Sequence, residues 1–152
     1  MKIITFDFDD TIVMSHMLIE NNQPVFVFDE YNNKIIELIQ SHIKAGDNIH
    51  IVTARSKDKE NFFPESTIPT YLDKLSLSYY FTPERVHYTE GALKLEILQK
   101  LGSTLHYDDN LEEISNNFGK ITVKNPFDYL KDSTEVGKAI IYDENDRILL
   151  LR

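Results

Sequence analysis

The chain has 152 residues, of which 41% are hydrophobic, and this predicts one main domain around a single sizeable core. It has no cysteine, which excludes disulfides, thiolate nucleophiles and zinc-thiolate sites. The net charge of -9 argues against strong nucleic-acid binding, because phosphate contacts need clustered Lys and Arg, but it permits a small anionic substrate. The N-terminus lacks a signal-peptide pattern and no apolar run approaches membrane-spanning length, so we expect a cytoplasmic protein with no membrane contact.

An acidic cluster follows the first predicted strand. Residues 2–7 form an apolar run typical of a strand covered on both faces, and Asp7, Asp9, Asp10 and Thr11 stand at its end. Ionised carboxylates about 4 Å apart repel each other by roughly 4 kcal/mol at an intermediate dielectric constant. The cluster therefore favours a hard, oxygen-binding cation between its members, and Mg²⁺ is the expected ion.

A hairpin-like flap and a helix are predicted next. Residues 12–28 predict the flap, with a turn at Asn21 and Asn22. Residues 31–45 have apolar side chains at helical spacing, and Gly46 follows as a stop signal. This pattern is the clearest helix in the chain.

The second predicted strand, residues 48–53, ends in Thr53 and is followed closely by Arg55. With the preceding strand and helix it makes a βαβ unit, whose crossover is almost always right-handed. A polar loop holding Phe62 and Phe63 follows.

The rest of the chain continues to alternate helices and strands. The predicted elements are a helix at residues 69–77, a strand at 85–88, a helix at 91–101, a strand at 104–107, a helix at 110–117 and a strand at 120–124. Such alternation indicates the α/β class, and we expect a Rossmann-like three-layer sandwich around a mostly parallel five-stranded sheet. Ligand sites in such sheets lie outside the carboxyl ends of the strands, where Asp7, Thr53 and Asp108 are expected.

These residues carry a resemblance to a known superfamily. Residues 1–125 resemble the haloacid dehalogenase-like (HAD) phosphohydrolases, whose four motifs are matched in order by Asp7-Phe8-Asp9-Asp10-Thr11, Thr53, Lys94 and Asp108-Asp109. The resemblance implies a phosphatase that hydrolyses phosphoric monoesters. Asp10 departs from the glycine often found at its position, and we assign it a structural role in the turn.

The resemblance also implies a role for each matched residue. Asp7 would be the nucleophile that forms an aspartyl-phosphate, and Asp9 the general acid and base. Thr53 would donate a hydrogen bond to the phosphoryl oxygens, and Lys94 would neutralise the charge shared by nucleophile and phosphate. A metal and an ammonium group are needed in any case, because a carboxylate that attacks a phosphate dianion meets repulsion.

The implied metal ligands are Asp7, the main-chain carbonyl of Asp9, and the pair Asp108 and Asp109. We favour Asp108 as the direct ligand because it comes first after its strand, and Asp109 stays the alternative direct ligand. Thr11 and Arg55 are candidate substrate-binding residues, and a surface salt bridge is an equal alternative for Arg55.

The candidate site residues also have purely structural interpretations. Taken singly, each acidic pair is as readily interpreted as solvated loop acids or helix caps as it is as part of an active site. Thr53 alone is more often a hydroxyl bonded to nearby backbone. Lys94 alone is more often a solvated surface cation. The histidines show no metal-ligand spacing and are assigned structural roles: His16, His42, His50, His87 and His106. A non-catalytic phosphate-binding module is the alternative to an enzyme.

The spacing of the motifs leaves room for a flap but not for a full cap domain, so we expect an open site. In the superfamily that the chain resembles, open sites suit large substrates, including macromolecular ends. The resemblance therefore implies a nucleotide or a nucleic-acid end as substrate, with a small sugar or metabolite phosphate as the alternative. The aromatic residues near the site could stack on a base, although aromatic residues in loops more often only pack.

The C-terminal residues predict a separate element. Residues 138–142 and 147–152 flank a turn at 143–146 and predict a β-hairpin. The hairpin resembles the opening of Nudix hydrolase domains, but the glutamate-rich box of that family is absent. We therefore expect a phosphatase domain at residues 1–130 and an extension at 131–152. The extension would be the start of a truncated, fused second domain, or a hairpin that packs on the sheet or pairs in a homodimer.

Overall fold

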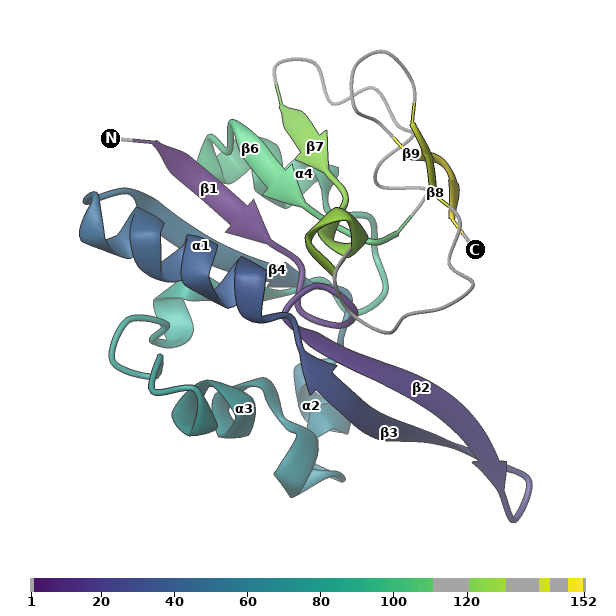
Figure 1. The fold of residues 1–152 in the computed structure, drawn as a ribbon. Coiled ribbons are helices and arrows are strands. Elements are labelled where there is room, and N and C mark those ends of the chain that lie inside the picture. The colour runs from purple at the N-terminus through teal and green to yellow at the C-terminus, as the bar shows by residue number, and fades with distance from the viewer. Residues whose placement is uncertain (1, 111–120, 131–139, 143–147, 152) are drawn as a thin grey trace.

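A five-stranded sheet organises the chain (Figure 1). The computed structural model describes residues 2–110, 121–130, 140–142 and 148–151. The strands of this sheet are β1 (Ile3–Phe6), β4 (Asn48–Thr53), β5 (Val86–Tyr88), β6 (Leu105–Tyr107) and β7 (Thr122–Lys124). Their order is β5-β4-β1-β6-β7, and every neighbouring pair is parallel. The α/β class and the parallel five-stranded sheet are therefore confirmed.

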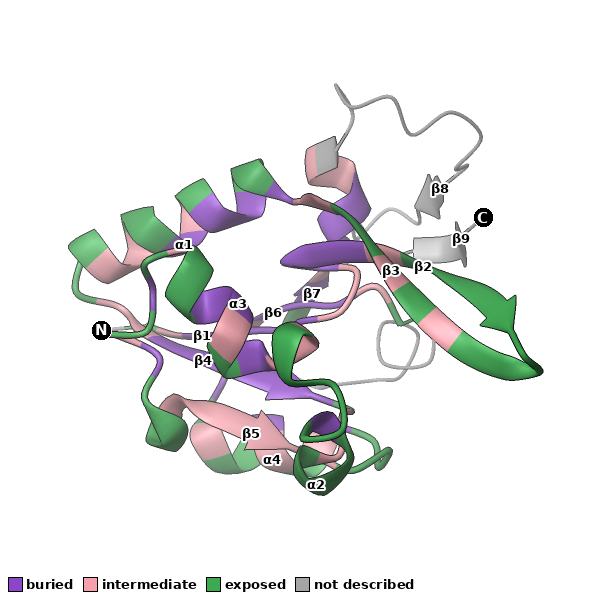
Figure 2. Cartoon of the chain, turned by 90° about the horizontal axis from the view of Figure 1, so that it is seen from below, coloured by how far each residue is buried: buried purple, intermediate pink, exposed green. Residues whose placement is uncertain are grey.

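Helices cover both faces of the sheet (Figure 2). They are α1 (Asn33–Lys44), α2 (Lys57–Glu60), α3 (Ile68–Lys74) and α4 (Leu95–Leu101), with short 3-10 turns at Pro64–Ser66, Pro83–Arg85 and Pro126–Leu130. The helix α1 begins after Asn32, whose side-chain oxygen accepts a hydrogen bond from the backbone N–H of Ile35 at 3.4 Å. An Asn at this position satisfies a helical N–H group that otherwise lacks a partner.

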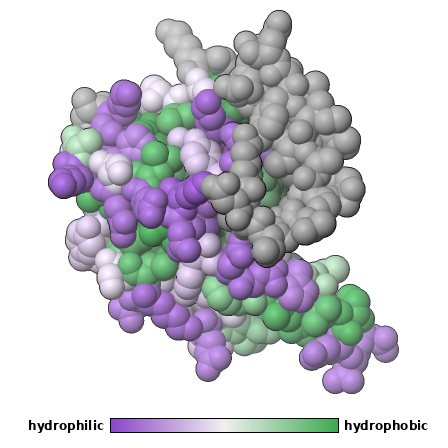
Figure 3. Space-filling view, in the orientation of Figure 1, coloured by the Kyte–Doolittle hydropathy of each residue, from purple (hydrophilic) through white to green (hydrophobic). Residues whose placement is uncertain are grey.

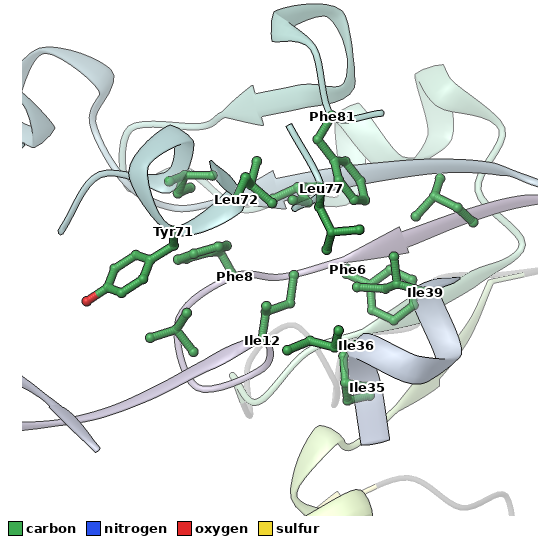
Figure 4. Packing of buried hydrophobic residues seen from close by; sticks show 14 of the residues in the cluster. Phe6, Phe8, Ile12, Ile35, Ile36, Ile39, Tyr71, Leu72, Leu77 and Phe81 are labelled. Carbon is green, nitrogen blue, oxygen red and sulfur yellow. The ribbon is translucent and has the colours of Figure 1, made fainter. Parts of the chain in front are cut away.

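The larger core lies between the sheet and the helices α1 and α3. Side chains from β1 and from α1 meet there with Phe8 and Ile12 of the connecting loop (Figure 4). Phe6 stacks on Tyr107 of the neighbouring strand β6, with ring centroids 4.6 Å apart. This packing fixes the ends of β1 and β6 relative to each other, and polar residues follow both strands.

The opposite face of the sheet carries a smaller apolar cluster and several polar side chains. Val52 and Val123 of the sheet pack with Leu98 of α4. Residues paired in register point to the same face, so Thr5 stands beside both His50 and His106. The Thr5 hydroxyl lies 2.8 Å from His106 Nδ1.

The predicted flap is a two-stranded antiparallel hairpin that projects from the body of the molecule (Figure 1). Its strands are β2 (Val13–Glu20) and β3 (Gln23–Tyr31), longer than the sequence suggested. The turn residues Asn21 and Asn22 have φ angles of 50° and 63°. Asparagine tolerates this left-handed region better than most residues, and two such residues in a row suit a tight hairpin turn.

Two predictions about the middle of the chain need correction. The segment read as a polar loop around Phe62 contains the short helix α2, which Ser56 caps by accepting from the backbone N–H of Lys59. The helix expected at 91–101 begins only at Leu95, because the N–H of Gly91 bonds to the carbonyl of Ala54 and holds that segment in a turn.

Some of the predicted elements fall partly or almost wholly outside the described residues. The helix expected at 110–117 lies outside the described residues apart from its first position. Strands β8 (Ile140–Tyr142) and β9 (Ile148–Leu151) pair in antiparallel fashion, and the predicted turn between them lies outside the described residues. Among the helices that are described, none is both long and apolar enough to cross a membrane.

Candidate active site

Two of the predicted residues are fixed where their strands end. The backbone N–H of Asp7 donates to the carbonyl of Tyr107 at 2.8 Å, and that of Asp108 donates to the carbonyl of Lys124 at 3.1 Å. These bonds extend the parallel ladder past β1 and β6. Both carboxylates therefore stand side by side at the carboxyl edge of the sheet.

Lys94 joins these two carboxylates. Its Nζ lies 2.8 Å from Asp7 Oδ1 and 2.6 Å from Asp108 Oδ2, and all three residues are almost wholly buried. Burial alone would lower the pKa of Lys94, but the charges of Asp7 and Asp108 outweigh it and raise the pKa above its ordinary value. The ammonium group is therefore held charged between two carboxylates that follow different strands.

The carboxylates still carry more negative charge than Lys94 can balance. Burial, and then the charge of Asp108, raise the pKa of Asp7 to about 6, against the opposing effect of Lys94. Burial and the charge of Asp7 raise the pKa of Asp109 well above its ordinary value. Carboxylate oxygens of Asp7, Asp108 and Asp109 lie within 4.8 Å of one another. Such a set of close oxygen donors can hold a hard divalent cation.

Asp108 is the most heavily hydrogen-bonded member of this group. Besides Lys94, it accepts from His106 Nε2 at 2.8 Å and from the backbone N–H of Asn110 at 2.8 Å. Burial would raise its pKa, but the bonds from His106 and Lys94 outweigh this effect and lower it. Asp108 is therefore ionised, and its orientation is fixed by the protein.

Asp9 belongs to a second, outer cluster. Arg55 binds both of its carboxylate oxygens, each at 2.8 Å, and also donates to Glu60 at 3.0 Å and to the backbone carbonyl of Ser66 at 2.6 Å. The side chain of Asp9 is 44% exposed, whereas that of Glu60 is 4% exposed. Arg55 thus forms the predicted salt bridge, but it is partly buried and lies next to the candidate acid and base.

The other predicted residues lie around these clusters. Thr11 is buried, and its hydroxyl donates to Asp7 at 3.4 Å. Thr53 is buried at the end of β4, and its hydroxyl accepts from the backbone N–H of Arg55 at 3.2 Å. Asp10 has a φ angle of 58° and accepts from the backbone N–H of Ser15 at 3.2 Å, which agrees with its predicted role in the turn.

Two residues with contacts in the site were missed by sequence reasoning. His106 was assigned only a structural role, although it stands two residues before Asp108 and strand alternation places both on one face. Glu60 lies in a run of charged residues that reads as a solvated helix, yet it is buried and accepts hydrogen bonds from Arg55 and from the hydroxyl of Tyr88. No sequence signal distinguishes Glu60 from its neighbours.

A pocket of about 580 Å³ opens beside the outer cluster. Asp9 and Arg55 line it on the side of the sheet, and residues of β3 and of the segment around Phe63 line it further out. Asp7, Lys94 and Asp108 do not line the pocket, and all three are almost wholly buried.

Comparison with known proteins identifies no family for this chain. No family model matches the chain. The chain is 30% identical over 125 residues to an uncharacterised protein of Acanthamoeba polyphaga mimivirus, a match that covers 77% of this chain. It spans 24% of the length of that viral protein. The chain is therefore similar to one segment of a much longer viral protein whose name states no activity.

Proposed function

We propose that this chain is a Mg²⁺-dependent phosphomonoester hydrolase of the HAD superfamily that works through an aspartyl-phosphate on Asp7. The observation that carries the proposal is the position of Lys94, whose Nζ is bonded to both Asp7 and Asp108 at the carboxyl edge of a parallel sheet. A buried cation between two carboxylates is suited to an attacking carboxylate that must approach a phosphate dianion.

The proposed reaction has two steps. In the first, a carboxylate oxygen of Asp7 attacks phosphorus, the bond to the leaving oxygen breaks, and Asp9 gives that oxygen a proton. In the second, Asp9 takes a proton from water, the water oxygen attacks phosphorus, and the bond to Asp7 breaks to release phosphate. Thr53 would donate its hydroxyl proton to a phosphoryl oxygen, since its own oxygen already accepts from the backbone N–H of Arg55.

Arg55 gives the reaction an additional requirement. The guanidinium of Arg55 donates hydrogen bonds to both carboxylate oxygens of Asp9. At least one of these bonds must break before Asp9 can protonate a leaving group. A substrate phosphate is an anion that can compete for the same guanidinium. We propose that Arg55 passes from Asp9 to the substrate when the ester binds.

The residues present fit a magnesium ion. Asp7, Asp108 and Asp109 offer hard oxygen ligands close together, and burial together with the neighbouring carboxylates raises the pKa values of Asp7 and Asp109. When bound, the ion would neutralise charge on the transferring phosphoryl group. Asp9 would contribute only its main-chain carbonyl, in keeping with the engagement of its side chain by Arg55. Asp108 and Asp109 both stay candidate ligands.

Several finer expectations stay part of the proposal. The strand order, with β1 central and β4 and β6 on either side of it, is consistent with a Rossmann-like fold. The antiparallel pair of β8 and β9 is consistent with a C-terminal hairpin. The cytoplasmic location, the division at residues 130 and 131, the Nudix-like start of a second domain and the possible homodimer stay predictions.

A phosphatase screen with Mg²⁺ tests the proposal. Wild type and Asp7→Asn are assayed side by side against nucleotides, phosphorylated oligonucleotides and sugar phosphates. We expect hydrolysis of at least one class by wild type and none by Asp7→Asn. If both proteins are inactive on every class while they still bind phosphate, the non-catalytic binding module replaces the enzyme.

A further inference from the structure

We propose that the pocket beside Asp9 binds the leaving group of the ester and selects a nucleoside. The inference rests on the proposed phosphatase reaction. A general acid must stand within hydrogen-bond reach of the oxygen that it protonates. Asp9 lines the pocket whereas the candidate nucleophile Asp7 does not. A phosphoryl group on Asp7 therefore places its leaving group on the Asp9 side, at the pocket.

Four aromatic side chains line the pocket, and they come from two separate segments. Phe26 and Phe28 belong to β3, while Phe63 and Tyr71 come from the segment that runs into α3. Phe28 and Tyr71 stack with ring centroids 6.0 Å apart, which ties the base of the hairpin to α3. The hairpin therefore forms one wall of the pocket and α3 with its preceding segment forms the other.

The outer aromatic side chains are exposed to solvent. Phe26 is 71% exposed and Phe63 is 65% exposed. Apolar side chains gather on the hairpin, at the lower right of the space-filling view (Figure 3). Exposed apolar surface that lines a pocket indicates a ligand-binding site more often than it serves the fold.

The chemistry of the walls favours a flat ring over a simple polyol. Aromatic side chains stack on nucleobases of any sequence because every base has a π-face. The volume of about 580 Å³ lies within the range of roughly 300 to 1,000 Å³ that holds drug-sized ligands. Gln23, Ser56 and Lys59 also line the pocket and can bond to the polar edge of a base or to a ribose hydroxyl.

The experiment compares two esters and three variants. Adenosine 5′-monophosphate carries a base, and glycerol 2-phosphate is a small ester without a ring. Phe26→Ala and Phe63→Ala each remove one exposed wall, and Phe62→Ala is the matched control, because Phe62 is 77% exposed and does not line the pocket. The measured quantity is kcat/KM for each ester, with Mg²⁺ present.

We expect wild type to prefer the nucleotide. Phe26→Ala and Phe63→Ala should each lower its kcat/KM by about 5-fold to 150-fold, the effect of losing one stacking partner. The loss for glycerol 2-phosphate should be clearly smaller, because its leaving group has no ring to stack. Phe62→Ala should change neither value. No preference in wild type, or equal losses for both esters, would overturn the pocket assignment and leave the phosphatase proposal standing.

A binding measurement tests the nucleoside site independently of hydrolysis. Adenosine 5′-monophosphate is titrated into Asp7→Asn by calorimetry, alone and combined with Phe63→Ala or Phe62→Ala. Affinity that falls with Phe63→Ala and not with Phe62→Ala supports the nucleoside site even if no ester is hydrolysed. If inorganic phosphate binds as tightly as the nucleotide, the pocket does not contact the nucleoside and the inference is wrong.

Discussion

Arg55 holds Asp9 through both of its carboxylate oxygens, with Nε 2.8 Å from Oδ2 and Nη2 2.8 Å from Oδ1. Bidentate pairs of this kind are among the stronger hydrogen-bonded contacts in proteins. The same guanidinium donates to Glu60 and to the carbonyl of Ser66. Arg55 thus connects the loop after β1 with the segment that forms a wall of the pocket.

Removal of Arg55 should destabilise the fold. Arg55→Met would leave Glu60, whose side chain is 4% exposed, without its cation. Breaking a buried pair from one side costs about 3 to 5 kcal/mol, and we expect the free energy of unfolding in urea to fall by about 3 kcal/mol. The double variant Arg55→Met with Glu60→Gln should recover part of that loss.

Arg85→Met is the matched control for Arg55→Met. Within the described part of the chain, Arg85 bonds to Asn48, to Tyr80 and to the backbone carbonyl of Ile49, and it forms no ion pair. Its replacement leaves no buried charge without a partner, so the free energy of unfolding should fall clearly less than in Arg55→Met. Equal losses for both arginine variants would refute the claim that Glu60 depends on Arg55.

Asp7→Asn should stabilise the metal-free protein at neutral pH. Burial and Asp108 raise the pKa of Asp7 from 3.8 to about 6, so the folded state disfavours the ionised form. The contribution of this group to stability therefore falls as the pH rises from about 4 to about 6 and is lowest above that range. We expect a gain of about 1 to 3 kcal/mol at pH 7.5 in the presence of a chelator, measured by urea unfolding.

The variant Asp73→Asn, in an exposed position of α3, serves as the control and should leave stability unchanged. Stability gained with loss of activity is the trade-off expected of a strained functional site. A metal-free Asp7→Asn protein that unfolds at lower urea concentration than wild type would contradict the account of this carboxylate.

The sheet could be predicted from the sequence because its signals are local. The strand β4 has the predicted bounds, 48–53, since its apolar run is flanked by polar residues. The gathering of Asp7 and Asp108 also followed, because parallel strands end at one edge. The pairing of Arg55 with Asp9 could not be predicted, since it depends on how two loops are placed in space. The burial of Glu60 depends in the same way on packing by distant residues.

The pair of His50 and His87 should make the fold sensitive to acid. His50 Nδ1 lies 3.0 Å from His87 Nε2, a bond that requires at least one neutral ring. Burial, with the nearby charges of His87 and Arg85, lowers the pKa of His50 from 6.5 to about 4. The stability from the neutral ring is therefore complete above pH 6.5 and is lost as the pH falls towards 4.

Urea midpoints measured between pH 7 and pH 4.5 test this statement. His87→Gln keeps a hydrogen-bonding group but cannot be protonated, so we expect a shallower fall in the midpoint than in wild type. The control is His16→Gln, because His16 lies in the exposed hairpin and pairs with Asp29. If His87→Gln and wild type have the same pH dependence, the pair does not set the acid sensitivity.

Asp109 and Asp108 should differ when each is replaced by asparagine. Asp108 accepts from Lys94, His106 and a backbone N–H, so Asp108→Asn should lower both stability and Mg²⁺ affinity. For Asp109 the pKa is raised well above its ordinary value by burial and by Asp7, so Asp109→Asn should keep the fold.

Mg²⁺ affinity, measured by calorimetry, separates the two ligands. Loss of an outer-shell group typically weakens metal binding by about 10-fold to 100-fold, so loss of a direct ligand should weaken it at least as much. We expect such a loss for Asp109→Asn without a loss in urea stability. Unchanged Mg²⁺ affinity in this variant would leave Asp108 as the direct ligand, as the sequence suggested.

Trapping of the phosphoenzyme shows whether Asp7 becomes phosphorylated. Asp9→Asn lacks both the acid of the first step and the base of the second. With 4-nitrophenyl phosphate, whose leaving group departs without a proton, Asp7 should still be phosphorylated, and the aspartyl-phosphate should then be hydrolysed slowly. The protein is mixed with 4-nitrophenyl phosphate and Mg²⁺, quenched in acid, digested and examined by tandem mass spectrometry. We expect a phosphate adduct on Asp7 in Asp9→Asn and none in the double variant that also carries Asp7→Asn. An adduct on another residue, or continued turnover by Asp7→Asn, would contradict the role of Asp7 as the nucleophile.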